Sequence, residues 1–287
     1  MSASLSPNAE HIQFWNEVLA EQFTRFRPMF VTMADAHSRG PIDRLGLKAG
    51  DRVLDVGCGF GETTLQIAER VRPDGSALGT DCCESFLTIA RADAAAAGID
   101  NAGFATLDAQ SADFEPEFDV VFARFGTMFF QNPTAGMRNI ATALKPRGRL
   151  LMIVWRTLEA NPSMAFSKQI VERHIPPPPD DAPNCGPGPF SMADPEVVET
   201  ILRLAGYVDI AFEQTDALAC IGATVEDAMA FQLSLGPAAA IFREGGDVAA
   251  QQRPAIEAEM HEVLAAHARP DGVFMDTSSW AVTARRG

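Results

Sequence analysis

Residues 51–66 read D-R-V-L-D-V-G-C-G-F-G-E-T-T-L-Q, and this stretch decides the fold. Its apolar positions 53, 54 and 56 have the spacing and β-branched content of a short buried parallel strand. Three alternate glycines follow, Gly57, Gly59 and Gly61, where the backbone has to bend sharply and approach a ligand closely. From Glu62 onward apolar residues recur at helical spacing. A strand, a glycine turn and a helix start in this order predict a cradle for a nucleotide-type cofactor.

The residues around the glycines narrow the choice of cofactor. A dinucleotide fingerprint, G-x-G-x-x-G, needs a glycine where Glu62 stands, and a P-loop needs a Gly-Lys-Ser/Thr sequence that this turn lacks. Asp55 lies two residues before the first glycine, and a carboxylate there suits a ligand with a positive ammonium group. S-adenosylmethionine carries such a group on its methionine end, whereas NAD does not. The glycine pattern alone also fits an ordinary tight turn, so the other strand ends have to decide.

The composition excludes several classes of protein. With 287 residues, of which 47% are hydrophobic, the chain can form one large α/β domain with insertions or two small domains. A formal net charge of −15 and the lack of any Lys/Arg run argue against a nucleic-acid partner, which would need a basic face. No apolar run is long enough to span a membrane and no signal peptide is recognisable, so cytoplasm is expected. We expect a monomer or a homodimer.

The cysteines indicate neither a disulfide framework nor a metal site. There are five, scattered along the chain: Cys58, Cys82, Cys83, Cys185 and Cys220. An odd number in a long chain is not typical of a disulfide-bonded secreted domain. No Cys-x-x-Cys or His-x-x-x-His spacing is present, so no metal is predicted.

Acidic residues follow two further predicted strands. Residues 77–80 form a short strand that ends at Asp81, about two dozen residues past the glycine turn, where a ribose-binding carboxylate belongs. Residues 104–107 form a third strand that ends at Asp108, whose carboxylate can accept a hydrogen bond from an adenine amino group. A helix cap or a loop acid is the alternative interpretation of Asp108. Parallel strands end at one edge of the sheet, so we expect Asp55, Asp81 and Asp108 to meet there.

Strands and helices alternate as far as residue 155. A helix is predicted over 84–97, a strand over 118–122, a helix over 134–144 and a fifth strand over 149–155. This alternation predicts an α/β fold with a doubly wound parallel sheet and right-handed crossovers.

The remaining segments are mostly helical. Helices are expected over 8–36, 41–47, 161–174, 194–205 and 224–267, the last broken at 236–237 and 245–246. Strands are expected over 207–212 and, at a sheet edge, over 279–284; a proline tract (176–179) and a loop (180–189) lie between. We therefore predict an N-terminal helical lid (1–48), a cofactor-binding core (49–155, 190–215 and 278–287) and insertions that form a substrate cover (156–189 and 216–277).

Several segments together resemble a known family. They are V-L-D-V-G-C-G-F-G-E-T-T at 53–64, G-T-D at 79–81, L-D-A-Q at 107–110, F-D-V-V-F-A-R-F-G at 118–126 and L-K-P-R-G-R-L at 144–150. This set resembles class I S-adenosylmethionine-dependent methyltransferases, and most nearly their ubiquinone/menaquinone-biosynthesis branch. The resemblance extends to F-W-N at 14–16, W-R-T-L-E-A-N-P at 155–162, G-P-F-S-M-A-D-P at 188–195 and S-W-A-V-T-A-R-R at 279–286. It implies a seven-stranded sheet whose last strand inserts antiparallel beside strand five.

The resemblance also implies roles for individual residues. Asp55 and the backbone at Gly57, Cys58 and Gly59 would hold the methionine part of S-adenosylmethionine. Asp81 would bind the ribose and Cys82 and Phe86 would flank the adenine, whose edge Asp108, Ala109 and Gln110 would contact. Arg124 and Phe125 would line the floor near the transferred methyl group. The chain departs from the family at Cys82-Cys83, where an apolar residue and a serine are more usual.

A small organic acceptor, aromatic or apolar, is the expected substrate, and S-adenosylhomocysteine the second product. Trp15 and Phe30 belong to an aromatic stripe that either covers the pocket or packs in the core. Arg124 would hold a substrate carboxylate or phenolate, or form a structural ion pair. No catalytic base is assigned, although four histidines lie in the expected lid helices: His11, His37, His174 and His261.

Two other functions compete with methyl transfer. One is an S-adenosylmethionine-binding regulatory or assembly subunit without transfer activity, because the three acids indicate binding alone. The other is a nicotinamide-dependent oxidoreductase, which Glu62 disfavours.

Overall fold

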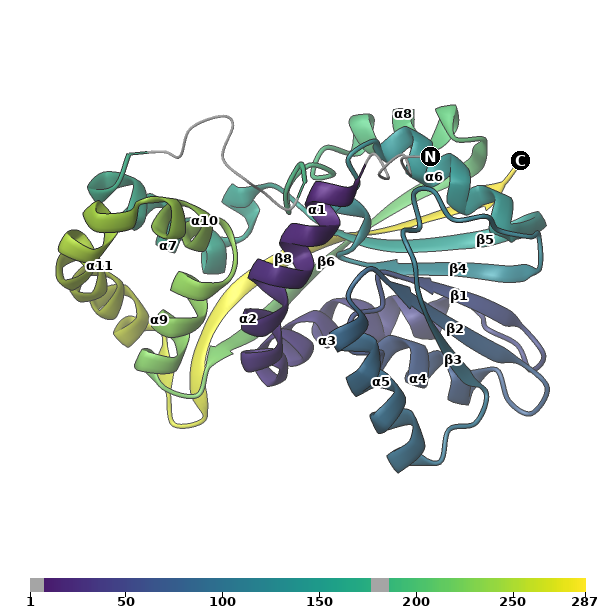
Figure 1. The fold of residues 1–287 in the computed structure, drawn as a ribbon, viewed down its shortest axis with the longest axis horizontal. Coiled ribbons are helices and arrows are strands. Elements are labelled where there is room, and N and C mark those ends of the chain that lie inside the picture. The colour runs from purple at the N-terminus through teal and green to yellow at the C-terminus, as the bar shows by residue number, and fades with distance from the viewer. Residues whose placement is uncertain (1–7, 177–185) are drawn as a thin grey trace, which may run out of the picture.

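The computed structural model describes residues 8–176 and 186–287 (Figure 1). Most of the proline tract expected over 176–179, much of the loop expected over 180–189, and Cys185 lie outside these residues.

One mixed sheet organises the chain. Its strands are β1 (Arg52–Val56), β2 (Ser76–Asp81), β3 (Ala102–Thr106), β4 (Phe118–Arg124), β5 (Leu144–Trp155), β6 (Tyr207–Gly222) and β8 (Gly272–Arg286). They run in the order β3-β2-β1-β4-β5-β8-β6, and the two-residue β7 (Ala268–Arg269) pairs with β8. The first five strands are parallel, and β8 inserts antiparallel between β5 and β6. The doubly wound, mostly parallel sheet is thus confirmed, with its antiparallel last strand beside β5.

Helices cover both faces of this sheet, as Figure 1 shows. On one side lie α3 (Arg27–Arg44), α4 (Glu62–Arg70) and α5 (Glu84–Ala97); on the other lie α6 (Pro133–Ala143) and α8 (Pro195–Leu204). The central strands are therefore buried on both faces, and Val53 and Leu54 of β1 are 0% exposed. This double burial explains why Val53, Leu54 and Val56 of β1 are all apolar.

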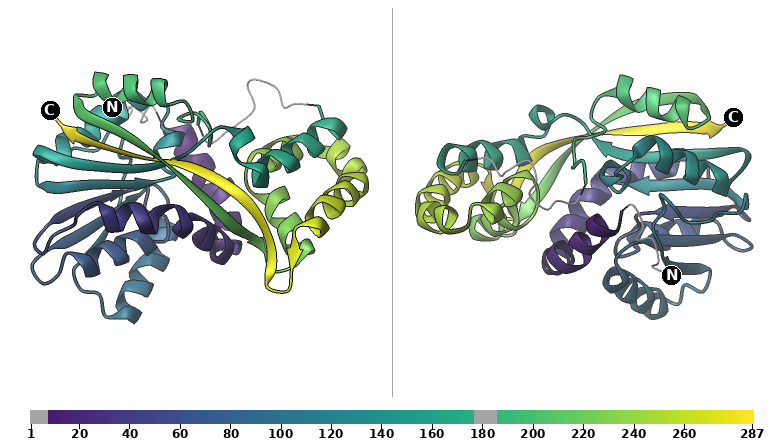
Figure 2. Two further views of the ribbon diagram at one scale, coloured as in Figure 1. Left: turned by 180° about the vertical axis from the view of Figure 1, so that it is seen from behind. Right: turned by 45° about the horizontal axis from the view of Figure 1, so that its top comes forward.

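A helical lobe stands beside the sheet on the extended ends of β6 and β8. It consists of α7 (Pro162–His174), α9 (Val225–Ser234), α10 (Pro237–Glu244) and α11 (Gly246–Ala266). Figure 2 shows both strands running from the sheet into this lobe. The expected strands at 207–212 and 279–284 were therefore much too short, and the expected boundaries at 215/216 and 277/278 fall inside β6 and β8. The expected edge position of the last strand was also wrong, because β6 forms that edge.

The N-terminal helices pack along the sheet and the lobe. α1 (Ala9–Phe14), a π-helical turn (Trp15–Leu19) and α2 (Ala20–Arg25) precede α3. The break expected between residues 36 and 41 is wrong, since α3 continues through Pro41 to Arg44. His37 and Ser38 in this part of α3 are fully buried, so tertiary packing outweighs the local effect of the proline.

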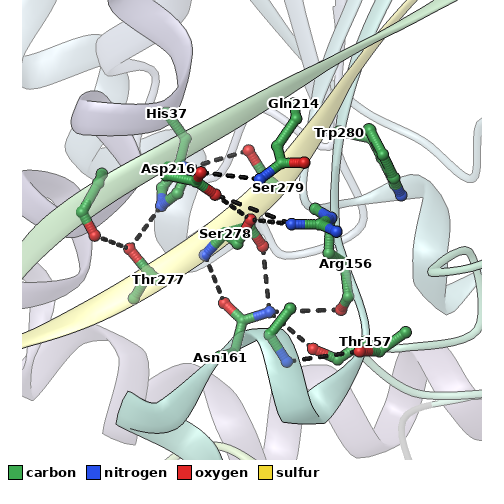
Figure 3. A network of polar contacts seen from close by, with 12 residues as sticks. His37, Arg156, Thr157, Asn161, Gln214, Asp216, Thr277, Ser278, Ser279 and Trp280 are labelled. Atoms are coloured by element: carbon green, nitrogen blue, oxygen red, sulfur yellow. Dashed lines mark hydrogen bonds and ion pairs between the residues drawn. The ribbon is translucent and has the colours of Figure 1, made fainter.

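A buried polar network joins α3 to the point where β6 and β8 leave the sheet (Figure 3). Thr277 Oγ1 donates to the carbonyl of Ala217 at 2.9 Å, so it accepts from His37 Nε2 at 2.8 Å. His37 Nδ1 in turn accepts from Ser279 Oγ at 2.9 Å. This pattern fixes a neutral His37 with its proton on Nε2. Burial lowers the pKa of His37 to about 4, while the backbone of Thr215 and the charge of Asp216 act to raise it and Arg124 acts to lower it.

We predict that His37 makes the fold less stable in acid. The unfolded chain takes up a proton on this histidine below about pH 6.5, but the folded protein does so only near pH 4, so stability is lost as the pH falls through this window. In His37→Gln this contribution is absent. The difference in free energy of unfolding between wild type and variant should shrink by about 1–2 kcal/mol between about pH 7.5 and about pH 5.5.

Urea denaturation at a series of pH values measures this difference, and groups that titrate in both proteins cancel. His261→Gln on α11, where the side chain is exposed, is the matched control and should run parallel to wild type. A gap between wild type and His37→Gln that does not change with pH would contradict the prediction.

Candidate cofactor and substrate site

The glycine turn is fastened to the end of β2. The N–H groups of Gly57 and Cys58 both donate to the carbonyl of Thr80, at 2.8 and 3.0 Å. Gly57, Gly59 and Gly61 all have positive φ angles, of 67°, 55° and 81°. At Gly61 a Cβ would lie 2.8 Å from Ala90 and from Phe104, so only glycine fits between the turn and its neighbours.

Gly59 is different because no protein atom opposes it. A Cβ built there has nothing within 4 Å, and the residue lines a cavity. Its N–H donates to Asp81 Oδ2 at 2.9 Å. The turn thus leaves an open space, lined by backbone, next to the Asp81 carboxylate. A ligand that has hydroxyl groups for the carboxylate and a polar chain for the backbone would fit there.

Asp55 does not reach this cradle. It is 0% exposed, and its Oδ2 accepts hydrogen bonds from the hydroxyls of Thr63 and Thr64 at 2.7 and 2.6 Å. Its Oδ1 has no hydrogen-bond partner among the described residues, and burial raises its pKa to about 6. The direct contact expected between Asp55 and the methionine ammonium group therefore finds no support. Asp55 instead ties the first turn of α4 to β1 beneath the glycines.

Asp81 and Asp108 do lie on the cavity wall. Asp81 Oδ1 accepts from the Cys83 N–H at 2.9 Å, which with Gly59 fixes both carboxylate oxygens; burial raises the pKa of this group. Asp108 accepts from the Gln110 N–H and the Ser111 hydroxyl. Each Asp81 oxygen accepts one of its two backbone N–H groups and can accept a further hydrogen bond from a ligand hydroxyl.

The N-terminal helices close over these two acids. Asn8 Nδ2 donates to Asp108 Oδ2 at 2.6 Å, and Asn16 Nδ2 donates to the carbonyl of Cys82 at 3.0 Å. Arg27, at the start of α3, bonds Glu62 at 2.9 Å and also Asp93. Glu62, which replaces the third glycine of a dinucleotide fingerprint, thus anchors the lid to α4.

A cavity of about 420 Å³ lies between the sheet, the N-terminal helices and the lobe. The predicted cofactor residues on its wall are Gly57, Cys58, Gly59, Asp81, Cys82, Phe86, Asp108, Ala109, Gln110 and Arg124. The predicted pocket residues Phe125, Trp15 and Phe30 line it as well. Asp55 is the one predicted residue that does not.

Aromatic rings make up much of the lid side of the cavity. Trp15 packs against Phe23 at 5.4 Å and against Phe129 at 5.0 Å between ring centroids, and Phe23 packs against Phe30 at 5.0 Å. Phe86 contacts Phe60 at 4.5 Å. Both roles considered for the aromatic stripe therefore apply, because the same rings pack against one another and line the cavity.

The end of β4 supplies a strained floor. Phe125 has φ 57°, a left-handed conformation that is uncommon for a bulky residue. Its ring stacks on Trp155 with centroids 3.9 Å apart, and its N–H donates to the carbonyl of Ile153. Arg124 lies beside it with its Nη1 on the Ser38 hydroxyl at 3.0 Å and no carboxylate within ion-pair distance among the described residues.

Ser163, Gln232 and Arg243 line the lobe side of the cavity. They fall within the predicted substrate cover (156–189 and 216–277), but none of them was named as a site residue. Of these three residues, only Gln232 could have been recognised in the sequence, as a polar residue within an apolar helical stretch. His37 and His174 are engaged elsewhere, in the buried network and with Glu259, and of the five histidines only His11 lines the cavity.

One group of potential metal ligands occurs among the described residues, formed by Asp81, Cys82 and Cys83. Asp81 already accepts two backbone N–H groups, and the buried Cys83 thiol has a strongly raised pKa, which keeps it protonated. This group is a poor metal site. No helix in the described ranges is both long and apolar enough to cross a membrane.

Residues 47–180 match the methyltransferase domain family. The chain is 31% identical over 147 residues to the ubiquinone/menaquinone biosynthesis C-methyltransferase UbiE of Pseudomonas fluorescens, covering 48% of this chain and 57% of that one. Residues 47–180 are therefore similar to a methyltransferase domain, and the chain resembles the UbiE-like branch of the class I S-adenosylmethionine-dependent methyltransferases.

Other methyltransferases match in the same way. Phosphoethanolamine N-methyltransferase 1 of Triticum aestivum is 33% identical over 175 residues, which cover 60% of this chain and 31% of that one. The chain thus spans between a third and three fifths of the length of these curated relatives. The YcgJ protein of Bacillus subtilis has the same fold, with a TM-score of 0.56 at 16% identity, over 87% of this chain and 98% of that one.

A pair of glycine variants tests whether the glycine turn forms the cofactor cradle. Gly59 and Gly98, the C-cap of α5, both have positive φ and open space at Cβ, so Gly59→Ala and Gly98→Ala should lose a similar free energy of unfolding, about 1–2 kcal/mol. Only Gly59→Ala places a methyl group in the cavity. It should abolish the rise in Tm that S-adenosylhomocysteine causes, and Gly98→Ala should retain it. Equal ligand shifts in both variants would remove Gly59 from the cofactor site.

Proposed function

We propose that this protein transfers a methyl group from S-adenosylmethionine to a small apolar or aromatic acceptor. The composition of the cavity wall carries this proposal. One side consists of the glycine turn and the strand-end acids, and the other consists of lid aromatics and lobe residues that cofactor binding does not require. A wall of this kind supports a two-ligand site.

The residues present fit the cofactor. The open backbone at Gly59 would receive the methionine part, the Asp81 carboxylate would accept both ribose hydroxyls, and Asp108 would accept the adenine amino group. When bound, S-adenosylmethionine supplies an electrophilic methyl group on a positively charged sulfur.

The protein's own contribution is positioning and exclusion of water. The packed rings of Trp15, Phe23 and Phe129 keep solvent from the lid side, and the floor at Phe125 is held rigid by its stack on Trp155. Holding two reactants in line contributes up to about 7–11 kcal/mol to such a reaction. Arg124, with its charge unpaired at the cavity, would stabilise an anionic oxygen of the acceptor.

His11 would take the acceptor's proton where the acceptor has to lose one. It lines the cavity, and its Nδ1 has no hydrogen-bond partner within the described residues. His11→Gln should leave the Tm shift with S-adenosylhomocysteine intact and lower turnover of a hydroxyl acceptor by about 10²–10⁴-fold. Turnover that does not change in this variant would exclude the role.

Asp81 provides the test of cofactor use. Asp81→Ala removes the acceptor of two backbone N–H groups and of the ribose hydroxyls, so binding of S-adenosylhomocysteine should weaken by about 100-fold or more, as measured by calorimetry. Asp74→Ala, in the exposed turn before β2, is the control and should bind like wild type.

Transfer itself is tested with radiolabelled methyl donor and a panel of phenols, hydroquinones and phosphorylated amino alcohols. Label should appear in an aromatic acceptor and disappear with Asp81→Ala. If S-adenosylhomocysteine binds but no acceptor is labelled, the binding-subunit alternative gains support. The cytoplasmic location, the absence of a nucleic-acid partner, the monomer or homodimer and the division into lid, core and cover stay predictions.

A further inference from the structure

Two neutral polar side chains stand in the lobe wall of the cavity. Ser163 is 1% exposed and Gln232 is 2% exposed, and both line the cavity. The Ser163 hydroxyl has no hydrogen-bond partner among the described residues. Gln232 Oε1 accepts from Ser167 Oγ at 2.9 Å, a hydroxyl that also bonds the carbonyl of Met164 at 3.1 Å, whereas Gln232 Nε2 donates to no other residue in the described ranges. Each side chain therefore has a donor that no described residue uses.

These two residues lie on the same helix–helix interface. Ser163 and Ser167 are one turn apart on α7, so they share one face of that helix. Ser167 contacts Gln232 on α9, which brings Gln232 to this face. Ser167 is a positioning residue, because its bond to Oε1 orients the amide group of Gln232.

The start of α7 is hydrogen-bonded to β8 through Asn161, as Figure 3 shows. Asn161, immediately before the helix, accepts from the Ser278 N–H at 2.8 Å and donates to the Ser278 carbonyl at 3.0 Å. It also donates to the carbonyl of Thr157 at 3.0 Å. The backbone just before Ser163 is thus tied to β8 by two hydrogen bonds.

We propose that Ser163 and Gln232 form an oxygen-binding subsite for the methyl acceptor, and that the acceptor carries a neutral carbonyl or hydroxyl oxygen on an apolar skeleton. This proposal rests on the proposed function. A buried hydroxyl without a partner costs stability, which a ligand oxygen would offset. Both groups are uncharged donors, so they match a neutral oxygen. A carboxylate or phosphate at this subsite would need a cation beside it, and Arg243 on the lobe side is paired with Glu244 at 3.0 Å. Arg124, which has no carboxylate partner among the described residues, lies at the end of β4 and would serve a separate oxygen of the acceptor.

A matched pair of probes tests the subsite in the full-length protein saturated with S-adenosylhomocysteine. 2-Naphthol and 2-methylnaphthalene have nearly the same shape, but only the first carries an oxygen. Calorimetry should show that wild type binds 2-naphthol roughly tenfold more tightly. Ser163→Ala and Gln232→Leu should each reduce this preference to about twofold or less, mainly because the affinity for 2-naphthol falls. Ser76→Ala, at the opposite end of β2 from the site, should keep the full preference.

Thermal unfolding without ligand provides an independent readout. Ser163→Ala removes an unsatisfied buried hydroxyl, so its Tm should rise by about 2–4 °C. A fall in Tm would show that the hydroxyl has a structural role and would overturn the proposal. So would equal binding of the two probes by wild type, or an unchanged preference in both variants. If S-adenosylhomocysteine itself fails to bind wild type, the proposed function fails first, and the two failures are thereby distinguished.

Discussion

The end of β2 fixes the position of everything around it. The Thr80 carbonyl accepts two N–H groups of the glycine turn, and the next residue, Asp81, accepts a third from Gly59. A turn with three positive-φ glycines has little conformational preference of its own, so these bonds define its shape. The same carboxylate that holds the turn also faces the cavity. The shape of the glycine turn and the position of the Asp81 carboxylate therefore depend on each other.

The lobe side of the cavity depends on the pairing of β6 with β8. β6 and β8 pair along most of their length, so the ribbon that completes the sheet also carries the lobe. Where the ribbon leaves the sheet, His37 bonds Thr277 and Ser279, and Asn161 bonds Ser278. Three consecutive residues of β8 are thus tied to α3 and α7. The lobe wall of the cavity is consequently held in a fixed position relative to the cofactor wall.

The cavity wall at the strand ends could be predicted from the sequence because its features are local. Glycines that need positive φ and acids at strand ends are recognisable from their spacing alone, and Gly59, Asp81 and Asp108 all line the cavity. Asp55 was misjudged because its surroundings depend on Thr63 and Thr64, which only the start of α4 brings beneath the turn. The outer half of β6 was missed because only its last residues, among them Ala219 and Ile221, are buried, which leaves no apolar run of strand length in the sequence. Ser163 and Gln232 could not be paired, since their proximity depends on the packing of α7 against α9.

The buried charges beneath the cavity form one unit rather than separate sites. Burial raises the pKa of Asp55 to about 6 and lowers that of Arg124, while each opposes the shift of the other. No carboxylate among the described residues lies close enough to pair directly with Arg124, so its charge is balanced at longer range by Asp55, Glu62 and Asp35. Removing Arg124 would favour the protonated form of Asp55 and thereby weaken the acceptor that holds Thr63 and Thr64. The electrostatics of the acceptor floor and the geometry of the cofactor turn are therefore coupled through Asp55, although this residue touches neither ligand space.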